Sequence, residues 1–391
     1  MGLGIGKGRV PVAAGDGAPA AGRREASRRA ALHGGMTLRE RAIIVFLIVL
    51  IAVVALLSLL AGDYDMAPMT VVTLVGRYLA FLVTSLPARV ASIFGMGPAP
   101  VFLTSQDSVV LFVIRIPRIA LGALTGAALA ASGAAYQGMF RNPMVSPDIL
   151  GVSNGAALGA AVSLLLGLPS VAVHAVSFLM GLLAVGLVML IAKIIGRDSR
   201  SIVVIILAGT VMSSMFSALV SLCKYLADPD DTLPAITYWL MGSFSRSGTY
   251  ANIGFLAGVV LVAGGALIAV RWRINALSFG DDEAKTMGVG VRSTRAVLIV
   301  AATLLTSATV SFCGVVGWIG LIIPHMARLV VGPNYRVLLP VSMLGGAAFT
   351  MIVDDVARVI VPGEMPAGVL TALIGAPLFI YLLVRGRKEW L

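Results

Sequence analysis

The side chains of this chain that could do chemistry lie at the ends of long apolar runs. Arg115 and Arg118 are three residues apart and precede a run, 119–139, that contains no charged residue. About twenty helical residues, at about 1.5 Å each, span the apolar core of a bilayer. The two arginines therefore mark one membrane surface, where a planar guanidinium group can bind a carboxylate through two hydrogen bonds.

The interiors of the apolar runs carry hydroxyls and amides in place of ionisable groups. An ionisable side chain at mid-membrane costs at least about 2.5 kcal/mol, so its presence there usually marks a function. A proton-coupled carrier or a membrane hydrolase needs ionisable groups at mid-membrane, and this chain has few of them there. The polar residues can line a path for a bulky polar solute or form ordinary interhelical hydrogen bonds, and they include Asn154, Ser213 and Ser217.

Histidine and cysteine are too few and too scattered for a metal centre. The chain has three histidines and two cysteines, and both cysteines, Cys223 and Cys313, lie within apolar runs where we expect them to pack. GIGKG near the start of the chain lacks the glycine spacing and the Ser or Thr of a phosphate-binding loop. We therefore expect no cofactor on this chain and no ATPase site.

Composition assigns the chain to the membrane. Of its 391 residues 59% are hydrophobic and only 12% charged, too little polar material to cover a soluble globule of this length. The net charge of +11 could suggest nucleic acid, but the basic residues are dispersed and have no interleaved aromatics. We predict an all-α polytopic membrane protein that contacts lipid and no nucleic acid.

Ten apolar segments predict ten transmembrane helices in a domain covering 42–391, after a disordered basic tail at 1–41. A cleaved signal peptide is the alternative for the first run, but that run exceeds the usual apolar core of about 7–15 residues. The predicted spans are 42–61, 119–139, a run that begins near 151, 171–195, 202–226, 253–270, 296–311, 315–331, 338–353 and 367–384. A further apolar stretch, 69–86, is interrupted by Arg77 and is expected to form a helix at the interface.

The distribution of positive charge predicts the orientation. With the tail inside, the outer segments hold only seven of the 29 Lys and Arg residues: Arg77, Arg89, Arg115, Arg118, Lys224, Arg246 and Arg358. Cytoplasmic segments are the ones that carry excess positive charge, so both termini are expected in the cytoplasm.

Small residues recur along two of the predicted helices. Gly151, Gly155 and Gly159 are four residues apart, and Gly122 and Gly126 begin the same pattern on the helix before. This spacing lets another helix approach closely in a membrane. Ordinary helix packing is enough to explain these glycines, so they need not have a role in transport.

Several longer motifs together resemble the FecCD-type permease family, the membrane subunits of ABC importers for iron-siderophores, haem and vitamin B12. The resemblance runs from about Val109 to the C-terminus. It rests on RIPR at 115–118, SGAAYQGMFRNPMVSPDILGVSNGAALGA at 132–160, WLMGSF at 239–244, GDDEAKTMGVG at 280–290, GWIGLIIPHMARLVVG at 317–332 and EMPAGVLTALIGAPLFIYLL at 364–383.

The resemblance implies a type II ABC importer permease bundle of ten helices in the inner membrane. It implies a homodimer or paired permease around a central path, two cytoplasmic ATPase subunits that bind ATP and Mg, and a soluble binding protein outside. The chain itself would be a transport subunit and not an enzyme.

The resemblance also implies roles for particular residues. Arg115, Arg118 and Arg358 match arginines that face acidic residues of the binding protein, although they could simply anchor helix ends at the headgroups. The segment between the sixth and seventh spans matches the helix that couples to the ATPase, or it is a solvated surface helix; its residues are Gly280, Asp281, Asp282, Glu283, Ala284 and Gly288. Ser199 and Ser201 lie near the family's inner gate. Residues 354 and 355 are both Asp, where the family usually has one.

The predicted function is import of an iron(III)-siderophore-type chelate by alternating access, driven by partner ATPases. Haem and cobalamin remain alternative cargoes within the family. An ion-coupled secondary transporter, and more remotely a membrane enzyme, are the alternatives from other classes.

Overall fold

The computed structural model describes residues 36–62, 64–85, 102, 105–195, 202–360 and 364–386. The chain divides into two units, residues 1–43 and 44–391. The described part of the first unit contains the beginning of α2 (Leu38–Leu60), where Thr37 and Glu40 form a reciprocal capping box with N···O distances of 2.7 and 3.2 Å. The helix thus begins within the predicted tail, and the rest of that tail lies outside the described residues.

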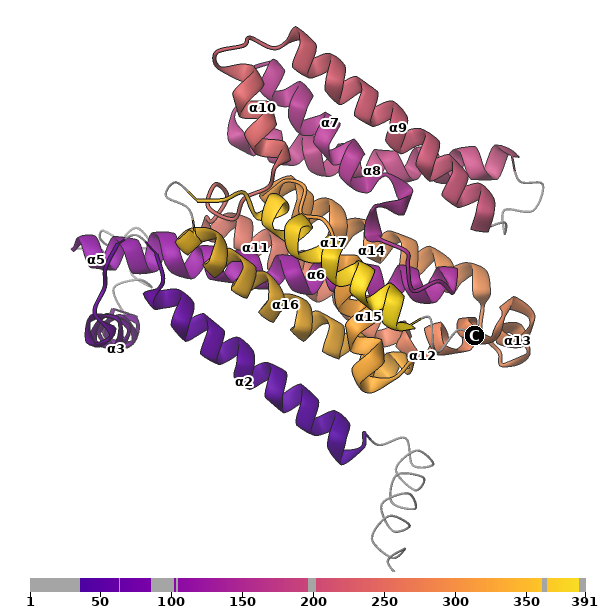
Figure 1. The fold of residues 1–391 in the computed structure, drawn as a ribbon, viewed down its shortest axis with the longest axis horizontal. Helices are drawn as coiled ribbons and strands as arrows, with labels where there is room; N and C mark the ends of the chain where they lie inside the picture. Colours follow the sequence, from indigo (N-terminus) through magenta and orange to yellow (C-terminus); the bar gives the residue numbers. More distant parts are fainter. Residues whose placement is uncertain are drawn as a thin grey trace, which may run out of the picture. The chain divides into compact units, whose positions relative to one another are not determined.

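Every regular element in the described part of the chain is helical, and eight helices are long and apolar enough to cross a membrane. They occupy eight of the ten predicted spans, so the all-helical membrane fold is confirmed (Figure 1). The eight are α2, the continuous helix α5–η1–α6 (Gln106–Val109, Val110–Arg115, Ile116–Phe140), α8 (Ser170–Ile195), α9 (Ile202–Leu226), the continuous helix α11–η3–α12 (Tyr250–Val259, Val260–Gly264, Gly265–Phe279), α14 (Val291–Cys313), α16 (Tyr335–Ile360) and α17 (Ala367–Gly386).

The third and eighth predicted spans contain shorter helices, α7 (Val152–Leu165) and α15 (Ile319–Val331). Their 14 and 13 residues rise only about 20 Å, less than the roughly 30 Å of a bilayer core. Pro324 and Pro377 lie inside continuous α15 and α17. Helices packed in a membrane tolerate proline because neighbouring groups satisfy the freed backbone.

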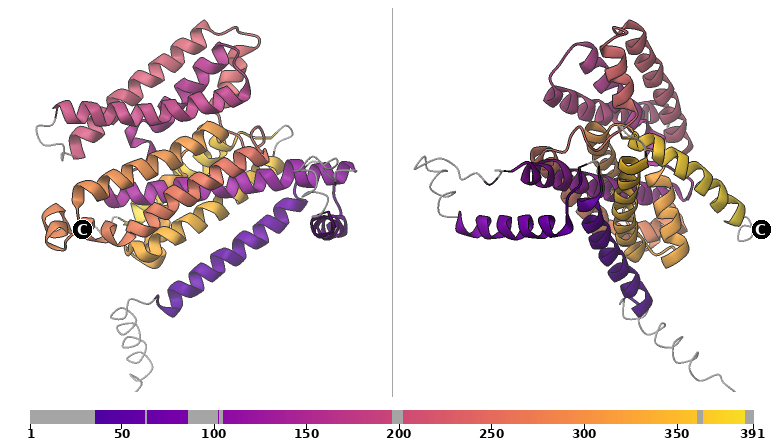
Figure 2. Two further views of the ribbon diagram at one scale, coloured as in Figure 1. Left: turned by 180° about the vertical axis from the view of Figure 1, so that it is seen from behind. Right: turned by 60° about the vertical axis from the view of Figure 1, so that its left-hand side comes forward.

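α6 is the central helix of the bundle, and it packs against α14, α15 and α16 (Figure 2). Its contacts with α16 pair Arg118 with Asp354 and Gly126 with Gly346. Gly138, nearer the end of α6, lies against Tyr335 at the start of α16. The two helices are therefore antiparallel and in close contact along most of their length.

Glycines permit this closeness. A Cβ atom on Gly126 would overlap the carbonyl oxygen of Gly346, and one on Gly133 would overlap the carbonyl oxygen of Gly320 in α15. The backbones of α6, α15 and α16 therefore meet without intervening side chains, which is how helices associate where lipid supplies no hydrophobic drive.

The connection from α6 to α7 packs into the bundle. Arg141 and Asn142 are exposed, but Pro147, in the 3₁₀ turn η2 (Pro147–Leu150), lies against Gly320, and the carbonyl of Ile149 lies against Gly209 of α9. This inward course explains why α7 is short, since residues before it already occupy part of the depth of the bundle.

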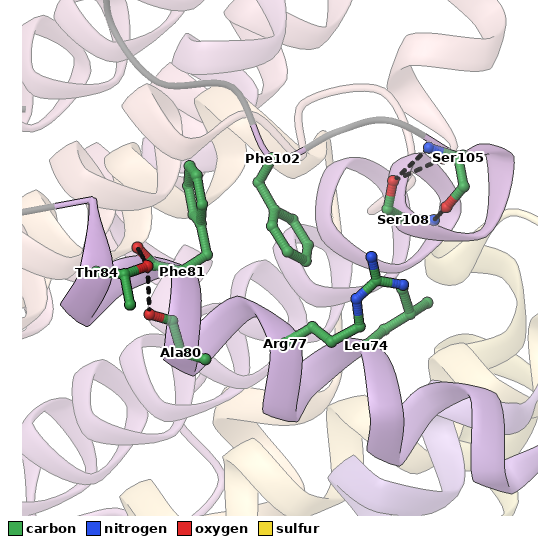
Figure 3. A pocket seen from close by; sticks show the side chains of 8 residues that line it. All are labelled: Leu74, Arg77, Ala80, Phe81, Thr84, Phe102, Ser105 and Ser108. Carbon is green, nitrogen blue, oxygen red and sulfur yellow. Dashed lines mark hydrogen bonds between the residues drawn. The ribbon is translucent and has the colours of Figure 1, made fainter. Parts of the chain in front are cut away.

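α3 (Pro68–Thr84) is the helix expected at the interface. One face packs through Leu74 and Phe81 toward Phe102, and the ring centroids of Phe81 and Phe102 are 5.2 Å apart (Figure 3). Two short helices complete the described fold, α10 (Thr232–Leu240) and α13 (Asp281–Thr286).

Candidate functional site

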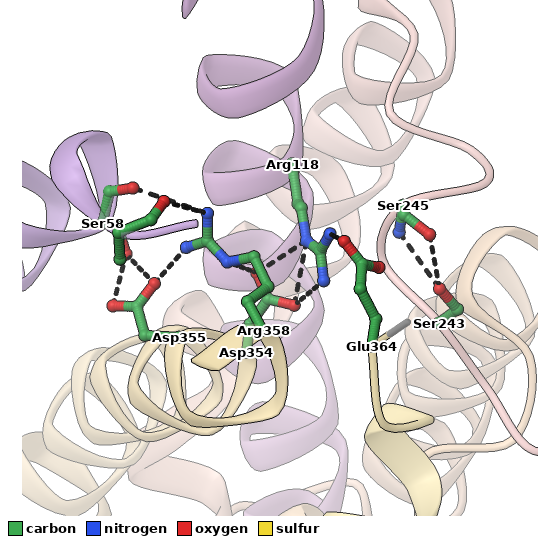
Figure 4. Close-up of polar contacts among 9 residues, drawn as sticks. Ser58, Arg118, Ser243, Ser245, Asp354, Asp355, Arg358 and Glu364 are labelled. Carbon is green, nitrogen blue, oxygen red and sulfur yellow. Dashed lines mark hydrogen bonds and ion pairs between the residues drawn. The ribbon is translucent and has the colours of Figure 1, made fainter. Parts of the chain in front are cut away.

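Two guanidinium groups and three carboxylates gather where the beginning of α6 faces the end of α16 (Figure 4). A third guanidinium group, that of Arg115, belongs to the residue three positions before Arg118. We call this group the arginine cluster, and its members are Arg115, Arg118, Arg358, Asp354, Asp355 and Glu364. The antiparallel packing of α6 and α16 brings these residues together from distant parts of the sequence. The formal charges of the six side chains sum to zero.

Arg118 binds two carboxylates. Its Nε and Nη2 donate to Asp354 Oδ2 and Oδ1 at 2.9 and 2.8 Å, a bidentate pair, while its Nη1 donates to Glu364 Oε1 at 2.6 Å. Arg118 and Asp354 are buried, but 37% of the Glu364 side chain is exposed. Glu364 is therefore the carboxylate of the cluster most open to exchange.

Arg358 follows Asp354 by one helical turn on α16. Its Nε lies 3.5 Å from Asp354 Oδ2, and its Nη2 donates to Asp355. Asp355 also accepts a hydrogen bond from the hydroxyl of Ser58 in α2, and Arg358 Nη1 donates to the carbonyl of Ala61 at 3.2 Å. The end of α16 is thereby tied to the end of α2.

Arg115 has carbonyl partners. Its Nη1 and Nη2 donate to the carbonyl oxygens of Leu59 and Tyr64, both at 2.5 Å. Beside it, the Tyr64 hydroxyl donates to Asp107, and this hydrogen bond raises the pKa of Tyr64. Arg115 thus fixes the connection between α2 and α3.

The structure brings all three predicted docking arginines together, and each is buried, with 3–6% of its surface exposed. Their neighbours, Asp354, Asp355, Glu364 and Ser58, were not predicted from the sequence. The spacing of Asp354 and Arg358, four residues apart on one helix, was the available signal. Chemically, the cluster is a set of carboxylate-binding guanidinium groups that already hold carboxylates of this chain.

The predicted coupling segment forms α13, which two left-handed glycines enclose: Gly280 has φ 133° and Gly288 has φ 79°. Asp281 pairs with Arg295 of α14 at 2.8 Å and lies 3.9 Å from Arg141 at the end of α6. α13 is therefore anchored to two core helices.

The outer side of α13 is exposed to solvent. Asp282 and Glu283 are exposed, whereas Ala284 is buried. Phe279 and Met287, which flank the helix, are also exposed and were not predicted. Acidic and apolar groups thus lie together on this surface.

The predicted path residues have different surroundings. Ser213 is half-buried beside Gly151, Asn154 is half-buried near the start of α7, and Ser217 is exposed on α9. Ser199 and Ser201 lie outside the described residues.

Four exposed hydroxyls lie along one face of α9 at intervals of four, three and four residues. We call them the α9 hydroxyl stripe: Thr210, Ser214, Ser217 and Ser221. Thr210, Ser214 and Ser221 each donate to the carbonyl four residues earlier. The regular spacing was visible in the sequence, but Thr210 and Ser221 were missed.

Eight apolar helices in the described part of the chain, with the glycine-rich α6 among them at the centre, define a multi-pass membrane protein. A model described as the FecCD transport family matches residues 48–385. The chain therefore belongs to the FecCD transport family, as its motifs indicated, and is an ABC importer permease of the inner membrane.

Known proteins resemble it over most of its length. The cobalamin import system permease of Halobacterium salinarum is 42% identical over 301 residues, which cover 76% of this chain and 79% of that protein. The molybdate import system permease of Haemophilus influenzae is 41% identical over 280 residues, covering 71% and 82%. A solved metal-chelate type ABC transporter in an inward-facing conformation has a TM-score of 0.73 and 35% identity, covering 88% of this chain and 99% of its own.

Proposed function

We propose that this chain is the permease subunit of an importer that moves an iron(III)-siderophore-type chelate across the inner membrane by alternating access. The main support for this proposal is the structural similarity to a metal-chelate type ABC transporter over 88% of the chain. The energy comes from two partner ATPase subunits, which bind the ATP and Mg. The similarity to cobalamin and molybdate permeases favours these cargoes, together with haem, as the alternatives.

Ten spans complete the proposed transporter. α7 together with the inward connection before it, and α15 together with residues 314–318, make the third and eighth crossings, so both termini lie in the cytoplasm. Two copies of the chain enclose the path. The α9 hydroxyl stripe supports this arrangement, because an exposed row of hydroxyls suits a polar path better than lipid.

The function is tested by uptake into proteoliposomes that contain this chain, its ATPase and a binding protein encoded with it. Ferric siderophore, haem, cobalamin and molybdate are offered separately, with ATP inside and the proton gradient dissipated. ATP-dependent uptake of ferric siderophore is expected. Uptake of another cargo would reassign the substrate. If uptake of every cargo stops when the proton gradient is dissipated, although ATP is present, the chain would be an ion-coupled carrier.

We assign binding-protein docking to the arginine cluster. Because Arg115, Arg118 and Arg358 all have partners within the chain, docking requires an exchange of partners. Glu364 is the most exposed carboxylate of the cluster, so a carboxylate of the binding protein takes its place on Arg118 Nη1.

Glu364→Gln should therefore strengthen binding of the binding protein, by about two- to fivefold, because a charged competitor for Arg118 is removed. Affinity is measured by titrating the binding protein into the reconstituted complex. Arg118→Lys keeps a positive charge beside Asp354 but loses the guanidinium fork, so it should weaken stimulation of ATP hydrolysis by the binding protein while basal hydrolysis persists. Unchanged affinity and unchanged stimulation would mean that the arginines only anchor helix ends.

We assign ATPase coupling to the segment Gly280–Gly288. Asp281 connects α13 to α14 through Arg295, so Asp281→Asn should lower uptake per ATP hydrolysed while the ATPase still co-purifies. Arg295→Gln should have the same effect, and the double variant should be no worse than either single one. If the losses of uptake per ATP add up in the double variant, the two residues act separately. If both single variants keep the full uptake per ATP, ATPase coupling cannot be assigned to this contact.

A further inference from the structure

A cavity of about 420 Å³ lies between α3 and the chain that enters α5. It is lined by Leu74, Arg77, Ala80, Phe81, Thr84, Phe102, Ser105 and Ser108 (Figure 3). It is separate from the arginine cluster, the coupling segment and the α9 hydroxyl stripe. Its residues fall outside the motifs that carry the family resemblance.

Two polar groups of this cavity, Arg77 and Ser105, can still donate hydrogen bonds, whereas the Ser108 and Thr84 hydroxyls already donate to backbone carbonyls. Figure 3 shows the Arg77 guanidinium group between the Phe102 ring and the turn that holds Ser105 and Ser108. Within the described residues, Arg77 has neither an ion pair nor a hydrogen bond from its side chain. Ser105 Oγ accepts from the Ser108 N–H, so its hydroxyl hydrogen can still be donated. The nearby Asp107 carboxylate accepts from Tyr64.

The outer face of α3 is apolar. Met69, Val72, Leu79 and Val83 are 58–75% exposed and are spaced three, seven and four residues apart, which places them on one side of the helix. Arg77, Ala80 and Thr84 lie along one border of this side. An apolar helix face bordered by a cation is the pattern of a helix lying in the membrane surface.

We propose that the cavity binds the phosphate of an anionic phospholipid, with the acyl chains lying along the apolar face of α3. Arg77 and Ser105 donate to the phosphate oxygens, while Phe81, Phe102 and Leu74 contact the glycerol region. Free phosphate shares the headgroup chemistry, but only a lipid also covers the apolar face.

The proposal is tested with the purified full chain in nanodiscs of equal parts phosphatidylglycerol and phosphatidylcholine, followed by native mass spectrometry of retained lipid. Wild type should retain phosphatidylglycerol in preference to phosphatidylcholine. Arg77→Gln should weaken that retention about fivefold, because one Lys or Arg near a membrane surface is worth about 1 kcal/mol toward anionic lipid. Ala80→Phe, which fills the cavity and leaves the charge in place, should also weaken it.

The matched control is Arg292→Gln, which removes an exposed arginine at the start of α14, away from the cavity. It should retain phosphatidylglycerol as wild type does. Equal retention by Arg77→Gln, or no preference between the two lipids in wild type, would overturn the proposal. Displacement of the lipid by millimolar inorganic phosphate would reassign the cavity to a free anion.

Discussion

Replacing Gly126 by alanine will prevent the close approach of α6 and α16, whereas the same replacement at Gly122, one helical turn earlier, will leave stability unchanged. A Cβ atom at position 126 would overlap the backbone carbonyl of Gly346 and the hydroxyl of Thr350. At position 122 there is nothing within 4 Å. Backbone cannot move aside as a flexible side chain can, so the helices must separate and lose their packing.

We expect Gly126→Ala to cost at least about 2 kcal/mol, the upper part of the range for overpacked cores. The measurement is the midpoint of thermal unfolding of the purified chain in detergent, with the yield of monodisperse protein as a second readout. Gly133→Ala, which would overlap Gly320, should behave like Gly126→Ala. Equal midpoints for the 122 and 126 variants would contradict the packing described here.

The membrane helices were predictable because they depend on local composition. The spans expected at 171–195 and 202–226 agree with α8 (Ser170–Ile195) and α9 (Ile202–Leu226) to within a residue. Each is a long apolar run with polar residues at its ends, and hydropathy alone determines such a boundary. The glycine pattern on α6 indicated close helix contact, but not which glycines make it.

The lengths of α7 and α15 could not be predicted, because they depend on packing between distant segments. Pro147 lies against Gly320, so the chain before α7 and the beginning of α15 meet within the bundle. A single apolar run does not show whether the residues at its end continue as helix or fold inward. That choice is made by neighbours more than a hundred residues away.

The candidate site was predicted only in part, because its contacts also depend on packing between distant segments. Motif resemblance identified Arg118 and Arg358, but their carboxylate partners depend on the antiparallel register of α6 and α16. Asp354 is 236 residues from Arg118 in the sequence, and only the fold makes them neighbours. The second aspartate, Asp355, departs from the family pattern, and the structure gives it partners in Ser58 and Arg358.

Asp354→Asn will be among the most destabilising single changes in the chain, because Asp354 is the carboxylate that two buried guanidinium groups share. Arg118 pairs with it at 2.8 Å and Arg358 at 3.5 Å, and all three side chains are at most 6% exposed. Removing one partner of a buried ion pair leaves an uncompensated charge, at a typical cost of about 3–5 kcal/mol. The measurement is the thermal unfolding midpoint in detergent, compared with wild type.

The control is Glu364→Gln, which removes a partly exposed partner of the same arginine. Its midpoint should change little, because solvent screens an exposed pair. The double variant Arg118→Gln with Asp354→Asn should be more stable than the sum of the two single losses predicts, since the charge left behind by either change is then gone. Additive losses would show that Arg118 and Asp354 contribute independently. A cost at position 354 no larger than that at 364 would show that the cluster adds little to the stability of the bundle and would leave partner exchange as its only role.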